Sequence, residues 1–168
     1  MSSKRKTSFG ACATVLACVT AVALMVGTPA HAHHSFASYN MDQVKVFTGV
    51  VTRVNPDANH LQIFFAPMTE ERKNVLRDAD NKPIVWAVEM GGSAQAAAEG
   101  ISVNTFPPGT IFSVAMHPLR SGGNAGSRVN PSAMFKCPER KPPAAGKHCD
   151  SVQGSTALGN GPLPEAKT

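Results

Sequence analysis

The feature that most constrains the fold is a series of short runs in which apolar and polar residues alternate. The first run, residues 44–54, reads VKVFTGVVTRV and is rich in β-branched residues, which favours an extended strand. Gly49 lies in its middle, where a glycine marks a bulge or a tight bend of the kind that a small barrel requires. The later runs with strand character are residues 60–66, 83–90, 110–116 and 129–136.

One helix is expected between the third and fourth runs. Ser93 is a suitable N-cap for a helix over residues 94–99, and Gly100 is a natural stop. Five strands with a single helix in this place are the order of an OB-type barrel. The sequence therefore predicts an all-β domain with one short helix, a small five-stranded OB-like barrel, and the alternative is a small β-sandwich. Trp86, the only tryptophan, is expected to anchor its core.

Two segments near the end of the barrel are harder to assign. Residues 119–128 contain several glycines and are expected to form a flexible hairpin tip. The run 129–136 contains Pro131, and a proline inside a strand indicates an edge position. This last run is taken as the fifth strand.

The first 32 residues have the features of a cleaved signal peptide. A basic start at residues 4–6 precedes an apolar run over residues 11–26, and Ala30-His31-Ala32 supplies the small residues of a cleavage site. Because a spanning helix needs roughly 20 apolar residues, cleavage between Ala32 and His33 is favoured over a retained anchor. The predicted location is the periplasm, or outside the cell, with no membrane span after processing.

The chain after cleavage is expected to contain one domain. The OB-like β domain is assigned to residues 33–136, and a loop closed by a disulfide to residues 137–150. Residues 151–168, rich in Gly, Pro, Ser and Thr, are expected to be disordered.

The two cysteines that remain after cleavage are expected to pair. Cys137 and Cys149 form an even pair in an oxidising compartment, and most simply make one disulfide. The alternative is a metal site made of Cys137, His148 and Cys149, which lacks a fourth ligand.

Cleavage also changes the charge. The formal net charge of +5 falls to about +2 once Lys4, Arg5 and Lys6 leave, so the basic composition belongs largely to the signal. The sequence has no glycine-rich phosphate loop before a helix and no ladder of aromatic and basic residues. We therefore expect no nucleic acid partner.

Short motifs in this chain resemble those of a known family of small exported bacterial proteins. Residues 32–36 read AHHSF, like the start of that family's mature parts, and residues 49–56 are similar to its G-x-V-x-x-V followed by Asn-Pro. Residues 86–89 match its W-x-V-E. The chain departs from the family pattern at Asp57, where a histidine is common, and at Val54, where a tryptophan is common. The family is catalogued only as a domain of unknown function, so the resemblance implies a periplasmic β domain of unknown role.

Cleavage before His33 would create a chelating group. A free α-amine can give up its proton to a metal near neutral pH, and with a ring nitrogen of His33 it forms a chelate that suits Cu(II). This arrangement looks like the histidine brace of secreted copper proteins. The further candidate ligands carry imidazole or carboxylate groups and are His34, His60, His117 and Asp57. The only cofactor that the sequence predicts is Cu(II), and the competing interpretation is that these histidines are structural.

Three functions are compatible with these features. The first is a binding module that holds copper at its mature amino terminus, and the second is a metal-free structural module that meets a periplasmic protein partner. The third, a copper-dependent oxidase or oxygenase, is the least favoured, since a flat aromatic substrate surface is not evident. No catalytic residue is predicted, because no nucleophile-elbow motif and no assignable carboxylate pair are found. Glu89 is expected to form a cross-strand ion pair with Arg53 or Lys45.

Overall fold

The elements of the barrel differ in the length of their connections, and a long connection joins β2 to β3. The computed structural model describes residues 36–57, 59–129 and 134–168. In chain order the elements are η1 (Phe36–Ser38), β1 (Lys45–Asn55), β2 (Gln62–Pro67), β3 (Trp86–Glu89), α2 (Ser93–Ala98), β4 (Ile111–Pro118), β5 (Ala125–Arg128), β6 (Met134–Lys136), η2 (Cys149–Ser151) and β7 (Thr156–Leu158). Within these ranges, no helix combines the length and the apolar character needed to cross a membrane.

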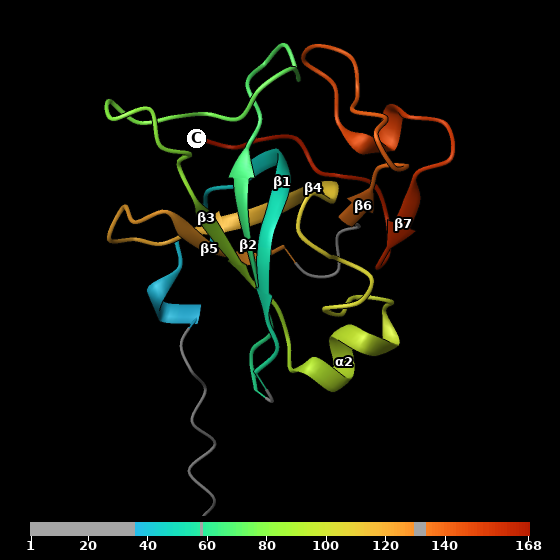
Figure 1. Ribbon diagram of the computed structural model, residues 1–168. Helices are drawn as coiled ribbons and strands as arrows, with labels where there is room; N and C mark the ends of the chain where they lie inside the picture. The colour runs from blue at the N-terminus through green and yellow to red at the C-terminus, as the bar shows by residue number, and fades with distance from the viewer. Residues whose placement is uncertain (1–35, 58, 130–133) are drawn as a thin grey trace, which may run out of the picture. The chain divides into compact units, whose positions relative to one another are not determined.

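Five strands close into a mixed barrel (Figure 1). Their order is β1-β2-β3-β5-β4, and β4 pairs with β1 to complete the ring. Neighbouring strands are antiparallel except β3 and β5, which run parallel. The α2 helix falls between β3 and β4, so the predicted OB-like barrel with one short helix is confirmed.

β1 contains a closely packed glycine and, further along the strand, a bulge. A Cβ at Gly49 would collide with the ring of Phe65 and would lie 3.0 Å from the carbonyl oxygen of Ala66. The pairing of β1 with β2 shifts register between Val51 and Arg53, which is a β-bulge. Together these features let one long strand pair with β2 on one side and with β4 on the other.

Three phenylalanines fill the centre of the barrel, and Trp86 packs against them from the margin. Phe65 and Phe112 have ring centroids 5.2 Å apart, Phe106 and Phe112 have centroids 5.8 Å apart, and all three rings are buried. Trp86 is half-buried, and its ring centroid lies 4.7 Å from that of Phe47. Because Trp86 is the first residue of β3, its inward-facing side chain lies at the end of the barrel.

The fifth barrel strand lies earlier in the chain than the sequence predicts. The strand that closes the barrel is β5, inside the segment expected to be a hairpin tip, and the described end of the predicted strand 129–136 forms β6, outside the barrel. A Cβ at Gly126 would collide with the carbonyl oxygen of His117 and would lie 2.7 Å from the end of the Met116 side chain. Glycine is therefore required for close strand approach here, and it also made the segment resemble a turn.

The helix starts one residue earlier than expected. Its N-cap is Gly92, and the hydroxyl of Ser93 instead donates a hydrogen bond of 2.6 Å to the carbonyl oxygen of Asp57. This bond ties α2 to the β1–β2 connection. Gly100 follows the helix with φ of +81°, as expected for a glycine stop.

The segment after β5 adds ordered structure to the barrel. The disulfide between Cys137 and Cys149 is present, with an S–S distance of 2.09 Å. The expectation of a disordered tail is wrong, because β7 pairs with β6 and Lys167 pairs with Val44. Leu158 is only 8% exposed and belongs to the core, so burial of this side chain and backbone pairing hold the tail in place.

Candidate functional site

Four side chains form a row across the outside of the barrel. Strand pairing places Gln62 of β2 beside Glu89 of β3, Glu89 beside Ser127 of β5, and Ser127 beside His117 of β4. Residues that pair directly on neighbouring strands project to the same face of a sheet. Val88 is fully buried inside the barrel, so Glu89 and its row project outward. We call these four residues the outer row; with strands about 4.8 Å apart, it spans roughly 15 Å.

His60 joins the outer row from the β1–β2 connection. Its Nδ1 lies 3.2 Å from Oε1 of Glu89. Nδ1 is thus the ring nitrogen that faces the carboxylate, and Nε2 is the ring nitrogen outside this contact. The imidazole is 40% exposed, and this nitrogen is therefore available to a ligand.

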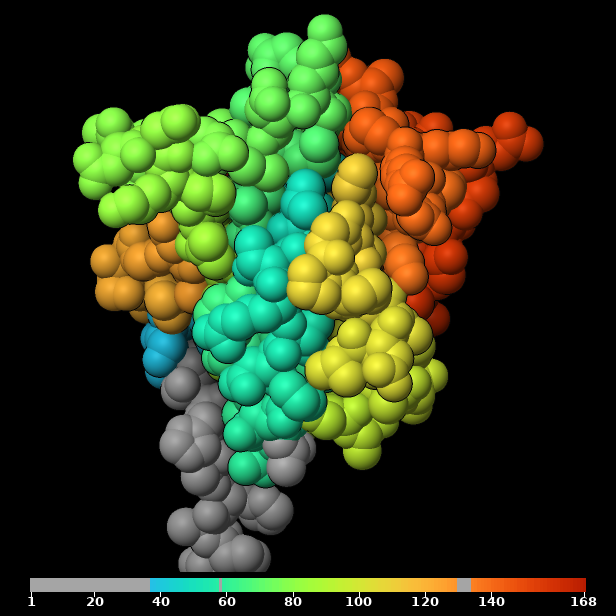
Figure 2. All heavy atoms as spheres, in the orientation of Figure 1, coloured from blue at the N-terminus to red at the C-terminus, as the bar shows by residue number. Residues whose placement is uncertain are grey.

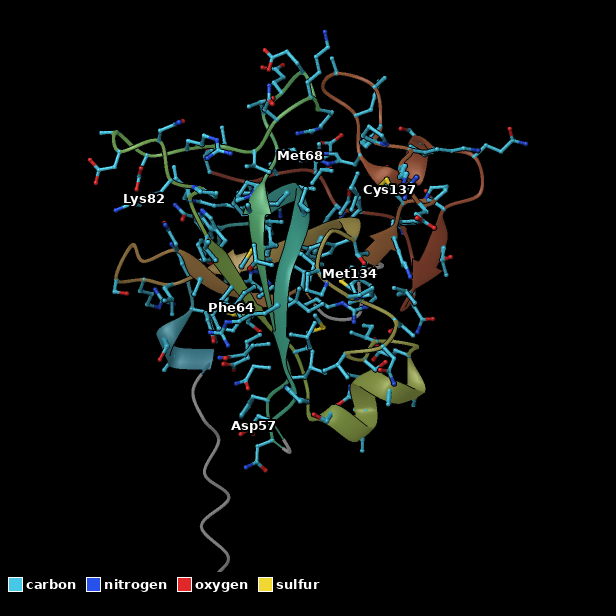
Figure 3. All side chains as sticks on the ribbon, in the orientation of Figure 1. Asp57, Phe64, Met68, Lys82, Met134 and Cys137 are labelled. Atoms are coloured by element: carbon cyan, nitrogen blue, oxygen red, sulfur yellow. A yellow bond between two sulfur atoms is a disulfide. The ribbon has the colours of Figure 1, made fainter. Side chains whose placement is uncertain are left out.

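Asp57 shapes the turn that carries His60. Its Oδ1 accepts the backbone N–H groups of Asn59, at 2.8 Å, and of His60, at 3.2 Å. These two hydrogen bonds, with that from Asn59 the stronger cause, hold the pKa of the exposed Asp57 carboxyl below its usual value. Figure 3 shows Asp57 at the end of the barrel opposite Met68. The structure thus brings two predicted ligands, Asp57 and His60, into one turn.

Tyr39 covers the outer row from the N-terminal side. Its side chain is buried, and burial, followed by the charge of Glu89 and a hydrogen bond to it, raises the pKa of Tyr39 to about 12. The phenol is therefore protonated at neutral pH and donates to Glu89, which is also in ion-pair contact with His60. The backbone around Tyr39 is bound to the end of β4, since Asn40 N–H donates to the Pro118 carbonyl at 2.8 Å.

His117 closes the row on β4. Its Nδ1 lies 2.8 Å from the carbonyl oxygen of Gln43. A backbone carbonyl only accepts, so Nδ1 donates this hydrogen bond, and Nε2 is the ring nitrogen outside the contact. In both imidazoles Nδ1 is therefore the nitrogen that contacts an oxygen of the protein, a carboxylate at His60 and a backbone carbonyl at His117.

The remaining predicted residues divide into two groups. Ala32, His33 and His34 lie outside the described residues. Among the described residues, no three His, Cys, Asp or Glu side chains come together as a metal-binding group. The alternative metal site at Cys137, His148 and Cys149 is ruled out in this oxidised form, because its two sulfurs are bonded to each other.

The roles of Tyr39 and Glu89 are not apparent from the sequence. Glu89 was expected to pair with Arg53 or Lys45, and that expectation is wrong. The guanidinium of Arg53 lies 3.6 Å from the centroid of the Phe64 ring, and the Lys45 ammonium lies 5.0 Å from the centroid of Trp86. Alternation does indicate that Glu89 faces outward, but the approach of Tyr39 depends on a return of the chain along β4.

Comparison with known proteins identifies one relationship. A model of a protein family of unknown function matches residues 21–128 of this chain. The match ends with β5, so it includes the barrel and the outer row, whereas β6, η2 and β7 follow it. No curated protein matches the chain, and no solved structure does.

Proposed function

This chain belongs to the DUF6152 family, whose function is unknown, and from that premise we propose that it is an exported binding module that holds Cu(II) at its mature amino terminus. Export rests on the signal features of residues 1–32, and the terminal chelate rests on His33. In this proposal the protein acts by binding and not by catalysis.

The orientation of two imidazoles supports the proposal most directly. Histidines that ligate metals almost always donate their other ring N–H to a carboxylate or a carbonyl, which fixes the tautomer and the ring direction. His117 makes such a hydrogen bond to the Gln43 carbonyl, and Nδ1 of His60 faces the Glu89 carboxylate at 3.2 Å. Each therefore presents Nε2, and imidazole nitrogen suits copper.

At the outer row lie two imidazoles, those of His60 and His117. Tyr39 is bound to Glu89, which contacts His60. In this proposal an imidazole, from His34, His60 or His117, is the third nitrogen ligand after the amine and ring of His33.

The proposal is tested by Cu(II) calorimetry and electron paramagnetic resonance on two proteins. One starts at His33, and the other carries one extra alanine before it. If the terminal amine is a ligand, the first protein binds one Cu(II) tightly, and the extension weakens binding by at least about tenfold, or ~1.4 kcal/mol. Equal, weak binding by both proteins overturns the copper site and favours a metal-free interaction module.

Single substitutions identify the third ligand. His60→Gln in the protein that starts at His33 should weaken binding and change the nitrogen hyperfine pattern, because an imidazole leaves the copper. His117→Gln tests the second imidazole in the same way. His148→Asn is the matched control, since it removes a histidine from a different part of the fold and should leave the copper signal unchanged.

A further inference from the structure

The disulfide-closed loop is fastened to the β2–β3 connection by a small set of hydrogen bonds. The Gly146 N–H donates to the Glu70 carbonyl at 2.9 Å, and Nε of Arg72 donates to the Lys147 carbonyl at 2.9 Å. Arg72 also donates to the carbonyl of Thr69 at 3.1 Å. Figure 2 shows the two segments side by side on the surface, the β2–β3 connection in green and the disulfide-closed loop in orange. We call this contact the Arg72 clasp.

Next to the clasp, His148 ends a chain of buried hydroxyls. Its Nδ1 lies 2.8 Å from Oγ1 of Thr48, which lies 2.7 Å from Oγ of Ser113. Ser113 in turn accepts the N–H of Cys149 at 2.9 Å. The chain is fully satisfied when Ser113 donates to Thr48 and Thr48 donates to Nδ1. This arrangement requires a neutral His148 with its proton on Nε2.

The charges around His148 oppose its protonation. Arg72 of the β2–β3 connection and Asp150 of its own segment are the charged groups that face it, whereas β1 and β4 contribute the hydroxyls of Thr48 and Ser113. Burial, and then the Arg72 guanidinium, lower the pKa of His148, and Asp150 acts in the opposite direction. A protonated His148 would therefore place a second cation in a half-buried contact.

Arg72 is also held in an unfavourable backbone conformation. Its φ is +58°, in the left-handed region that non-glycine residues rarely adopt. Such strain persists only while surrounding interactions offset it. The two carbonyls that its guanidinium contacts, those of Thr69 and Lys147, supply such interactions. Loss of either hydrogen bond therefore favours a change in the backbone conformation of Arg72.

We propose that the Arg72 clasp is an acid-sensitive latch. Protonation at Nδ1 of His148 turns this nitrogen from an acceptor into a donor, so the hydroxyl of Thr48 must reorient. The new cation repels Arg72, Arg72 leaves the Lys147 carbonyl, and residues 138–147 lift from the β2–β3 connection. The disulfide holds both ends of the loop, so the motion is local and reversible. It uncovers the outer face of β1 and β4 at Thr48 and Ser113.

Amide hydrogen exchange of the mature, oxidised protein tests the latch. The protection factor of the Gly146 amide, whose hydrogen bond crosses the clasp, should fall by at least about threefold between about pH 7.5 and pH 5. The Met68 amide, which donates to the Thr48 carbonyl at 2.8 Å inside the sheet, should keep its protection. An unchanged Gly146 protection factor overturns the proposal.

Two variants assign the effect to the charges. In His148→Asn the amide oxygen can still accept from Thr48 but the side chain does not titrate, so Gly146 protection should become independent of pH. In Arg72→Gln the repelling cation is absent, so the acid response should be weaker than in the natural chain. The same acid response in His148→Asn as in the natural chain overturns the proposal. If His148→Asn does not fold, an undiminished response in Arg72→Gln does so.

Discussion

At the scale of single residues, Glu89 is the group that joins the parts of the outer row. Its carboxylate accepts from the phenol of Tyr39 and lies 3.2 Å from the imidazole of His60. Charge-assisted hydrogen bonds of this kind are about twice as strong as neutral ones. Glu89 therefore fixes two side chains that arrive from different connections, the segment before β1 and the turn after it.

The titration of Tyr39 reports this contact directly, because it is the only tyrosine of the chain. Ultraviolet absorbance should give a midpoint near its raised pKa of about 12. Glu89→Gln removes the charge and should move the midpoint toward the ordinary value of 10.0 without reaching it, since burial is the larger cause. The contribution of the protonated Tyr39 to the free energy of unfolding is complete below pH 10.0 and is lost as the pH rises through about 12.

The control for this titration is Glu139→Gln, a change at a carboxylate that is 87% exposed and belongs to a different segment. It should leave the midpoint where it is in the natural chain. Circular dichroism at each pH value shows whether the protein is still folded. A midpoint near 10.0 in the natural, folded protein would contradict the contact.

Part of this residue-scale arrangement follows from the sequence. The alternation of residues along β3 is sufficient to predict that Glu89 and Val88 face opposite sides of the sheet. The group of turn-forming residues around Asp57 is also recognisable as a turn. The sequence does not predict the partners of Glu89, because they depend on strand register and on the path of the chain before β1. An ion pair between Glu89 and Arg53 was expected, but the Arg53 guanidinium instead stacks on the ring of Phe64.

At the scale of elements, β5 shows how a strand can be hidden in a sequence. Its residues, Ala125–Arg128, have weak strand propensity and follow two glycines. The strand forms because β3 and β4 supply hydrogen-bonding partners on both sides, not because of its own preference. Gly126 is required where β5 approaches the backbone of His117, so the residue that most resembled a loop signal is a packing requirement.

Replacement of Gly126 with alanine tests this argument. Its Cβ would meet backbone atoms of His117, which cannot rotate away, so we expect a loss of about 1–3 kcal/mol in the free energy of unfolding. The matched control is Gly123→Ala in the preceding turn, where the nearest contact of a Cβ would be an ordinary 3.5 Å to Leu119. Urea denaturation of both variants gives the comparison, and equal stabilities would contradict a close approach at Gly126.

At the scale of the whole molecule, four of the five barrel strands, the helix and the disulfide were predictable, whereas β5 and β7 were not. The predicted strands follow from local patterns, which specify where the chain is extended. Residues 151–168 lack such a pattern, yet they are ordered, because β6 offers β7 a free edge and the core accepts Leu158. The composition of a segment indicates the conformation that it prefers in isolation. It does not indicate whether the rest of the fold provides a strand with which the segment can pair.

Leu158 therefore separates a disordered tail from an integral one. Leu158→Ala should lower the free energy of unfolding by about 2–4 kcal/mol, because it removes buried methyl groups and leaves a cavity. The control is Val103→Ala, whose side chain is 45% exposed and should cost less than about 0.5 kcal/mol. Arg128 also donates to the Leu158 carbonyl at 3.0 Å, a bond that the substitution keeps. A loss of stability in Leu158→Ala but not in Val103→Ala means that the tail stabilises the barrel. If neither variant changes the free energy of unfolding, residues 151–168 are a dispensable extension.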